Sequence, residues 1–125
     1  MLKEKYSSNK LITNIIKSIE EVKGKEVILI DMKKIDNSPC DYFIICDGSS
    51  NTQVSAIVSK IKKNVSKLLS EKPLNIEGLE NCKWVLIDYI NVVVHVFQKE
   101  IRKYYNIENL WGDAKHTKFI SKIEL

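Results

Sequence analysis

Residues 84–97 read WVLIDYINVVVHVF, two short apolar runs that meet at Ile90 and Asn91. Both runs are rich in β-branched and aromatic residues, which favour β-strands. A two-residue turn at Ile90 and Asn91 would set residue 89 opposite 92, 87 opposite 94 and 85 opposite 96. The stretch therefore predicts a β-hairpin, and its register decides which side chains share a face of the sheet.

The two faces of this hairpin differ in character. The apolar face, expected to point into the core, carries Val85, Ile87, Tyr89, Val92, Val94 and Val96. The opposite face, called the mixed face below, carries Trp84, Leu86, Asp88, Val93, His95 and Phe97. On it, His95 lies across from Leu86 and within reach of Asp88. Two interpretations follow: a later helix covers the mixed face as a second core layer, or the face is an open patch for a partner.

The N-terminal half alternates helical and strand patterns. Apolar residues recur at helical spacing over 11–22, with Ser7 or Ser8 as a cap and Gly24 as the stop. Strands are expected over 26–32 and 42–47. The second of these is apolar throughout, which is typical of a central strand.

A second helix is expected after the second strand. Ser50 and Gln53 have the spacing of a capping box, and Pro73 ends the helical pattern. The apolar face of this helix carries Val54, Ile57, Val58, Ile61, Val65, Leu68 and Leu69. The remaining expected elements are an edge strand at 75–77, a helix over 98–106 and a last strand near 119–123.

This order of elements predicts an α/β fold, a single domain with a mixed β-sheet flanked by helices. A chain of 125 residues is long enough for one core and too short for two. We expect one domain over residues 1–125, with its core over about 8–113 and a C-terminal tail over 114–125.

Composition excludes several classes of protein. With 44% hydrophobic and 29% charged residues, the chain is expected to fold as a soluble globule. It has neither the ~20-residue apolar run of a membrane helix nor an N-terminal signal sequence, so the expected location is the cytoplasm, with a processed organelle protein as the alternative. The net charge of +4 comes almost wholly from lysine, with Arg102 the sole arginine. Direct RNA contact through the lysines of the second helix is therefore only a secondary expectation.

The sequence gives little support to a metal site. Cys40, Cys46 and Cys82 have no C-x-x-C spacing, and free thiols are expected. Only His95 and His116 could join them as ligands. We expect neither a metal nor another cofactor.

Catalytic patterns are incomplete. The turn 48–50, Gly-Ser-Ser before a helix, could bind phosphate and resembles the nucleotide-binding turn of nucleotidyltransferases. Those enzymes hold two metals with paired acids on a following strand, where this chain offers only Asp88. A pair of His95 and Asp88 also lacks a nucleophile in a recognisable elbow. We therefore expect no enzyme and no catalytic residues, with residual nucleotide binding as an open alternative.

Two longer strings carry a family resemblance. Residues 84–113 read WVLIDYINVVVHVFQKEIRKYYNIENLWGD, which resembles W-x-L-x-D-x-G-D-V-x-V-H-x-F followed by R-x-x-Y-x-L-E-x-L-W. Residues 41–57, DYFIICDGSSNTQVSAI, resemble D-x-F-V-I-x-x-G-x-S-x-x-Q, and Glu77-Gly78 matches an E-G before the tryptophan. These patterns are similar to the signature of the ribosomal silencing factor family, also called Iojap or RsfS. The resemblance covers about residues 8–113.

The sequence departs from the family pattern at the hairpin turn, where Ile90 and Asn91 replace Gly-Asp. Isoleucine resists the positive φ of a tight turn. Either the turn is of another type or the register slips by one residue, which would move His95 to the other face. Thr52 also replaces the arginine that usually follows G-x-S.

The resemblance implies a binding protein. Family members have a fold similar to nucleotidyltransferases without the catalytic acids. They bind ribosomal protein fourteen of the large ribosomal subunit and sterically block joining of the small subunit, which represses translation. Some members are linked to large-subunit assembly, and homodimers occur in the family.

Together the resemblance and the mixed face indicate a set of partner-binding residues. The set consists of Trp84, Asp88, His95, Phe97, Tyr104, Tyr105, Leu110 and Trp111. Glu77 and Gly78 are expected to shape the neighbouring loop. Within the set, Phe97, Tyr105 and Leu110 are expected in the core rather than in contact with a partner. Asp88 and Glu108 would complement a basic partner.

Overall fold

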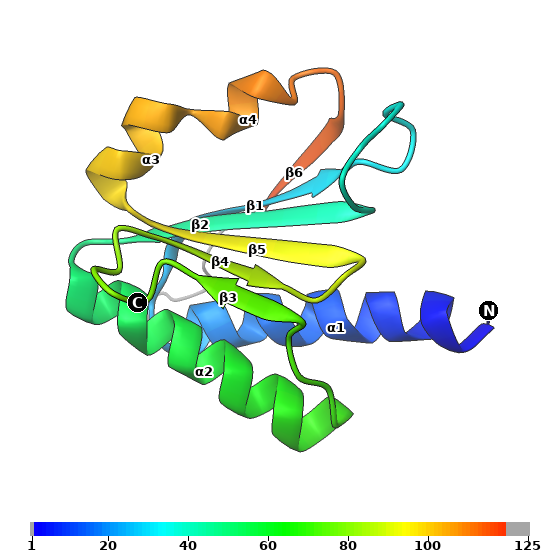
Figure 1. The fold of residues 1–125 in the computed structure, drawn as a ribbon, viewed down its shortest axis with the longest axis horizontal. Helices are drawn as coiled ribbons and strands as arrows, with labels where there is room; N and C mark the ends of the chain where they lie inside the picture. The colour runs from blue at the N-terminus through cyan, green and yellow to red at the C-terminus, as the bar shows by residue number, and fades with distance from the viewer. Residues whose placement is uncertain (1, 120–125) are drawn as a thin grey trace.

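The computed structural model describes residues 2–119 (Figure 1). Four helices and six strands follow one another within this range. In chain order they are α1 (Leu2–Glu21), β1 (Lys25–Asp31), β2 (Tyr42–Gly48), α2 (Asn51–Leu69), β3 (Asn75–Glu77), β4 (Trp84–Asp88), β5 (Val92–Gln98), α3 (Lys99–Tyr105), α4 (Ile107–Leu110) and β6 (Lys115–Phe119).

All of these strands belong to one sheet, in the order β3-β4-β5-β2-β1-β6. The pair β2–β5 is parallel and the other pairs are antiparallel, so the sheet is mixed. The apolar strand β2 is central, as predicted. Helices α1 and α2 lie on one face of the sheet, and α3 and α4 lie on the other (Figure 1). The predicted α/β domain with a mixed, helix-flanked sheet is confirmed.

The hairpin of β4 and β5 has the predicted register. Ile87 pairs with Val94 and Leu86 pairs with His95, so no slip occurs. The apolar face of the hairpin packs against α1 and α2 in the larger core cluster. The mixed face joins a second, smaller cluster on the other side of the sheet. The sheet therefore separates two apolar layers, and the mixed face belongs to the smaller one.

The hairpin turn keeps this register despite its isoleucine. Ile90 adopts a φ of 76°, the positive value that isoleucine disfavours. The Asn91 N–H donates to the Tyr89 carbonyl at 2.9 Å, and the Ile90 N–H donates to Asp88 Oδ1 at 2.7 Å. The turn is therefore a three-residue turn around Ile90 within a two-residue hairpin loop. Asp88, the last residue of β4, stabilises the turn through its hydrogen bond with the Ile90 N–H.

Several helix boundaries differ from the prediction. Helix α1 begins at Leu2, so Ser7 and Ser8 lie inside it and the predicted cap is wrong. Ser50 does cap α2, and its hydroxyl accepts from the Gln53 N–H. Leu68, predicted on the buried face, is 64% exposed in the last turn of α2, whereas Leu69 packs against the core, and Ser70 ends the helix in a left-handed conformation.

The C-terminal segment is more structured than predicted. The helix expected over 98–106 ends at Tyr105, because Asn106 turns left-handed with a φ of 46° and starts the short helix α4. A strand lies at Lys115–Phe119 and pairs with β1, whereas most of the strand expected near 119–123 falls outside the described residues. The chain after 119 lies outside the described residues. The expected tail thus contributes a strand to the sheet.

Candidate functional site

Aromatic rings pack together on the mixed face of the hairpin. Trp84 stacks on Phe97 with ring centroids 4.8 Å apart, and its Nε1–H donates to His95 Nδ1 at 3.1 Å. Phe43 of β2 meets the His95 ring in a T-shaped arrangement at 4.6 Å. Because opposed positions on one face of a strand pair are in contact, the sheet register alone brings these rings together.

His95 is held as a neutral, structural histidine. It is only 5% exposed, and this burial lowers its pKa to about 4. Since Nδ1 accepts from Trp84, the neutral ring carries its proton on Nε2, which has no hydrogen-bond partner among the described residues. With that pKa the ring is uncharged at neutral pH, and nothing in the cluster is a nucleophile. The arrangement supports packing rather than acid–base catalysis.

The two interpretations of the mixed face each describe part of it. Side chains from α3, from α4 and from the turn after α4 pack against the smaller cluster: Ile101, Ile107, Trp111 and Ala114. Trp111 meets the Phe43 ring edge-on, with centroids 5.9 Å apart. Toward the hairpin turn the helices do not cover the sheet (Figure 1). The mixed face is therefore core at one end and open at the other.

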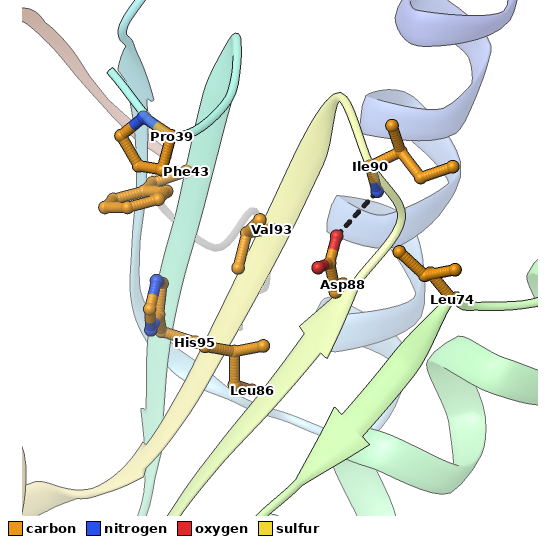
Figure 2. A pocket seen from close by; sticks show the side chains of 8 residues that line it. All are labelled: Pro39, Phe43, Leu74, Leu86, Asp88, Ile90, Val93 and His95. Carbon is orange, nitrogen blue, oxygen red and sulfur yellow. Dashed lines mark hydrogen bonds between the residues drawn. The ribbon is translucent and has the colours of Figure 1, made fainter. Parts of the chain in front are cut away.

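The open end holds a pocket of about 480 Å³. Its lining is Pro39, Phe43, Leu74, Leu86, Asp88, Ile90, Val93 and His95. Figure 2 shows Leu74, Asp88 and Ile90 on one side of this pocket and Pro39, Phe43 and His95 on the other. Asp88 is the only acidic residue in this lining, and its Oδ1 accepts the hydrogen bond from the Ile90 N–H in the hairpin turn. Ile90 and Leu74 are 62% and 70% exposed, so the rim of the pocket is apolar.

The structure sorts the predicted partner-binding residues by exposure. His95 and Phe97 are buried, which confirms the core assignment of Phe97. The residues of intermediate exposure are Trp84, Asp88 and Trp111. Those that are exposed are Tyr104, Tyr105 and Leu110.

The expectation that Tyr105 and Leu110 belong to the core is wrong. Their helices are short, and each presents only one side to the sheet: Ile101 and Ile107 fill the inner positions. Tyr105 still rests on the Trp84 ring, with centroids 5.0 Å apart, so its exposed edge continues the aromatic surface. Tyr104, 80% exposed, extends that surface further.

Glu77 and Gly78 lie beside this aromatic surface at the end of β3. Glu77 is exposed and accepts a hydrogen bond from the Asn75 side chain at 2.8 Å. Gly78 has a φ of 94°, and a Cβ at this position would collide with the carbonyl oxygen of Trp84. Gly78 therefore allows the loop to pass close to the first residue of β4.

Sequence reasoning missed a buried ion cluster behind α3. Arg102 is 7% exposed and donates to Asp47 Oδ2 at 3.0 Å, to Glu108 Oε2 at 2.7 Å and to the carbonyl of Glu26 at 2.7 Å. Burial raises the pKa of Asp47, and Arg102 opposes that rise. Glu108, expected to face a basic partner, is instead engaged inside the molecule. The single arginine of the chain was the signal, since a guanidinium can hold several oxygens at once.

The N–H groups at the Gly-Ser-Ser turn donate hydrogen bonds to side chains of the same chain. The Ser49 N–H donates to Gln53 Oε1 at 2.7 Å, and the Gln53 N–H donates to Ser50 Oγ at 3.1 Å. Two N–H groups that would be offered to a phosphate are thus already used. Asp47, just before the turn, is paired with Arg102. Over residues 2–119 there is also no group of His, Cys, Asp and Glu side chains that could hold a metal ion.

Comparison with known proteins matches this chain to one family. The family described as "Ribosomal silencing factor during starvation" matches residues 5–124. The chain belongs to the ribosomal silencing factor family. Its curated relatives include "Ribosomal silencing factor RsfS" from Halalkalibacterium halodurans, which is 42% identical over 108 residues, covering 86% of this chain and 91% of that protein.

Solved structures agree with this membership of the ribosomal silencing factor family. A crystal structure of a Chromobacterium violaceum protein has a TM-score of 0.79 and 32% identity, covering 93% of this chain and 92% of that one. More distant family relatives include "Protein Iojap, chloroplastic" from Zea mays, 31% identical over 81% of this chain and 43% of that protein. Among the residues that the structure describes, no helix is long and apolar enough to cross a membrane.

Proposed function

We propose that this chain is a cytoplasmic, non-enzymatic translation repressor. It binds the large ribosomal subunit through ribosomal protein fourteen and blocks joining of the small subunit. The observation that carries the proposal is the open end of the mixed face, where an apolar pocket with one carboxylate adjoins exposed aromatic side chains. Such a surface is typical of protein-docking sites, and it lacks a set of residues arranged for catalysis.

The proposed docking surface consists of the pocket together with Trp84, Tyr104, Tyr105, Leu110 and Trp111. A standard protein interface takes roughly 800 Å² from each partner, which one sheet face and its adjoining helices can supply. Repression then requires only that the protein bind the large subunit tightly, because the bound domain occupies the space that the small subunit needs. Asp88 gives this surface a negative charge that suits a basic ribosomal protein.

The buried residues have a supporting role in this proposal. His95 and Phe97 fix the position of Trp84, one by a hydrogen bond and the other by ring stacking. Tyr105 in turn rests on Trp84. The contacts with the partner then come from exposed side chains whose positions are set by this stack, and Gly78 lets the adjacent loop lie close to it.

Sedimentation of mixed ribosomal subunits tests the proposal. The protein is expected to co-sediment with large subunits and to reduce the joined particles. The double variant Tyr104→Ser with Leu110→Ser changes two exposed side chains and is expected to weaken both effects at least about tenfold, since aromatic and apolar anchors dominate interfaces. A matched control, Leu68→Ser, alters an exposed leucine on α2, on the other side of the sheet. Absence of co-sedimentation for the unchanged chain would refute the proposal.

A second candidate function is assistance in large-subunit assembly. A mouse relative named "Mitochondrial assembly of ribosomal large subunit protein 1" is 33% identical over 73 residues, covering 57% of this chain and 32% of that protein. The same docking surface would serve, with precursor particles as the target. Accumulation of immature large subunits in cells that lack the protein, without a change in subunit joining, would favour this function. A homodimer formed through the same surface would compete with either.

A further inference from the structure

The backbone at Ile90 is held in a conformation that its side chain disfavours. Its φ of 76° places a β-branched residue in the left-handed region, where Cβ crowds the backbone. The other residues with positive φ in the described part of the chain are Lys23, Glu26, Asn37, Ser70, Cys82, Asn106 and Gly78. Unlike Ile90, none of these is β-branched, and Gly or Asn would fit this turn without strain.

Packing inside the molecule does not account for Ile90. Its side chain is 62% exposed, so most of its apolar surface remains in water. The hydrogen bonds of the turn use backbone N–H groups and the Asp88 carboxylate, which any residue at position 90 would leave intact. Strained backbone that brings no internal packing gain is characteristic of functional positions. We therefore expect the Ile90 side chain to contact another molecule.

Ile90 forms the rim of the hairpin pocket together with Leu74, which is 70% exposed (Figure 2). Both side chains stand on the same side of the pocket as Asp88. Asp88 makes no ion pair with any residue in the range 2–119, and its Oδ2 is free of the turn hydrogen bond. The pocket thus offers apolar walls and one unpaired carboxylate in a chain whose net charge is +4.

We propose that Ile90, which stands where the family pattern has glycine, is a contact residue that this chain adds toward its own ribosomal partner. The pocket holds an apolar side chain of that protein against Ile90 and Leu74, and a neighbouring cation of the partner meets Asp88. This inference rests on the proposed function, because the partner is the large-subunit protein named there. Apolar contact supplies affinity, while the carboxylate selects a basic protein over a neutral or acidic one.

The variant Ile90→Gly separates an effect on partner binding from an effect on the stability of the fold. Glycine adopts the positive φ freely, so the thermal midpoint Tm should not fall, and relief of strain should raise it by about 2 °C. Binding to purified large subunits should weaken at least about tenfold, because the rim side chain is lost. Ile90→Asn, which tolerates the same φ but is polar, should lose binding in the same way.

Two control variants match the two changes made by Ile90→Gly. Ser70→Gly introduces glycine at another exposed left-handed position, with a φ of 55° at the end of α2, and should leave binding unchanged. Leu68→Ala removes an exposed aliphatic side chain on α2 and should also bind like the unchanged chain. Leu74→Ala, on the pocket rim, should weaken binding as Ile90→Gly does.

Each outcome decides the question. Weaker binding of Ile90→Gly with an undiminished Tm supports the inference. Unchanged binding overturns it, and so does a fall in Tm alongside binding, which would make Ile90 a structural residue. If sedimentation shows a dimer that Ile90→Gly converts to monomer while subunit binding persists, the occupant of the pocket is a second copy and the inference fails. If the unchanged chain binds no large subunits, the proposed function itself fails.

Discussion

At the scale of single residues, His95 shows how a polar side chain serves a packing role. Its ring accepts one hydrogen bond from Trp84 and otherwise contacts aromatic rings. A neutral imidazole suits this environment, and a charged one does not, because burial penalises the charge. The histidine of the family signature can therefore be understood as the residue that sets the orientation of Trp84.

Acid should destabilise the fold through His95. Its pKa of about 4 in the folded chain lies below the 6.5 of an unperturbed histidine, so the unfolded chain binds more protons between these pH values. The free energy of unfolding should fall as the pH drops from about 6.5 to about 4, by up to about 3 kcal/mol. Urea unfolding at several pH values measures this loss.

The matched variant for this measurement is His95→Asn, whose amide oxygen can still accept from Trp84. Asp47 acts in the opposite direction, because its raised pKa favours the folded chain as the pH falls. Only the difference between the unchanged chain and His95→Asn isolates the histidine. Equal pH dependence in the two proteins would contradict the assignment.

Among the four glycines, Gly78 has the least room for an added Cβ. Gly78→Ala should destabilise the protein by about 2 kcal/mol or more, because its φ is 94° and the new methyl group would meet the Trp84 carbonyl. Displacement of Trp84 should also weaken subunit binding. Gly112→Ala is the control, since its Cβ would lie 3.3 Å from the Asn109 carbonyl oxygen and no positive φ is involved. Thermal unfolding of both variants provides the comparison.

At the scale of elements, the α3–α4 segment depends on Arg102 for its position. The two helices are short, and they bury few large side chains against the sheet. Arg102 joins α3 to Asp47 of β2, to the Glu26 carbonyl of β1 and to Glu108 of α4. One guanidinium thus fixes both helices against two strands.

Arg102→Met should destabilise the fold by about 3–5 kcal/mol, because it leaves Asp47 buried without a partner. Adding Asp47→Asn to this variant should restore part of the loss, since the unpaired charge is then removed. Glu108→Gln alone should have a smaller effect, because that side chain is partly exposed. Chemical denaturation measures the three variants. An additive double variant would show that the two groups do not interact.

At the scale of the whole molecule, docking through a protein face and docking through RNA predict different salt dependence. The lysines of α2 lie on the opposite side of the sheet from the mixed face (Figure 1). Lys63→Glu with Lys67→Glu should therefore change the affinity for large subunits less than about threefold and leave its salt dependence nearly unchanged. If these lysines contact ribosomal RNA, each lost phosphate contact should lower the slope of log affinity against log salt by about one.

The hairpin shows how much of the site was predictable. Two strands with a defined turn fix the faces, so the register of β4 and β5 followed from sequence alone. The sequence left the turn type at Ile90 and Asn91 undecided. In the structure the Ile90 N–H donates to the Asp88 carboxylate, and the hairpin keeps its register. Sequence also indicated which side chains share the mixed face, because alternation along a strand is a local property.

Burial on α3 and α4 could not be predicted in the same way. These helices are too short for a periodic pattern, so nothing in the sequence distinguished exposed Tyr105 and Leu110 from inward Ile101. The Arg102 cluster joins residues far apart in the chain, which local patterns do not report. The pocket depends on how the loop at Pro39 and the residue Leu74 meet the hairpin, a matter of tertiary packing.

The parallel pairing of β2 with β5 has a consequence for folding during synthesis. Tyr42 pairs with Val92, so the centre of the sheet cannot close until β5 has left the ribosome. Long-range parallel pairing slows folding, because the entropy of closing a long loop is lost before the strand contacts form. A nascent chain that ends before β5 should expose the apolar faces of α1 and α2 to chaperones. Because the central strand pair forms late, the sheet closes only after the ribosome, whose subunit joining this protein is proposed to block, has released β5.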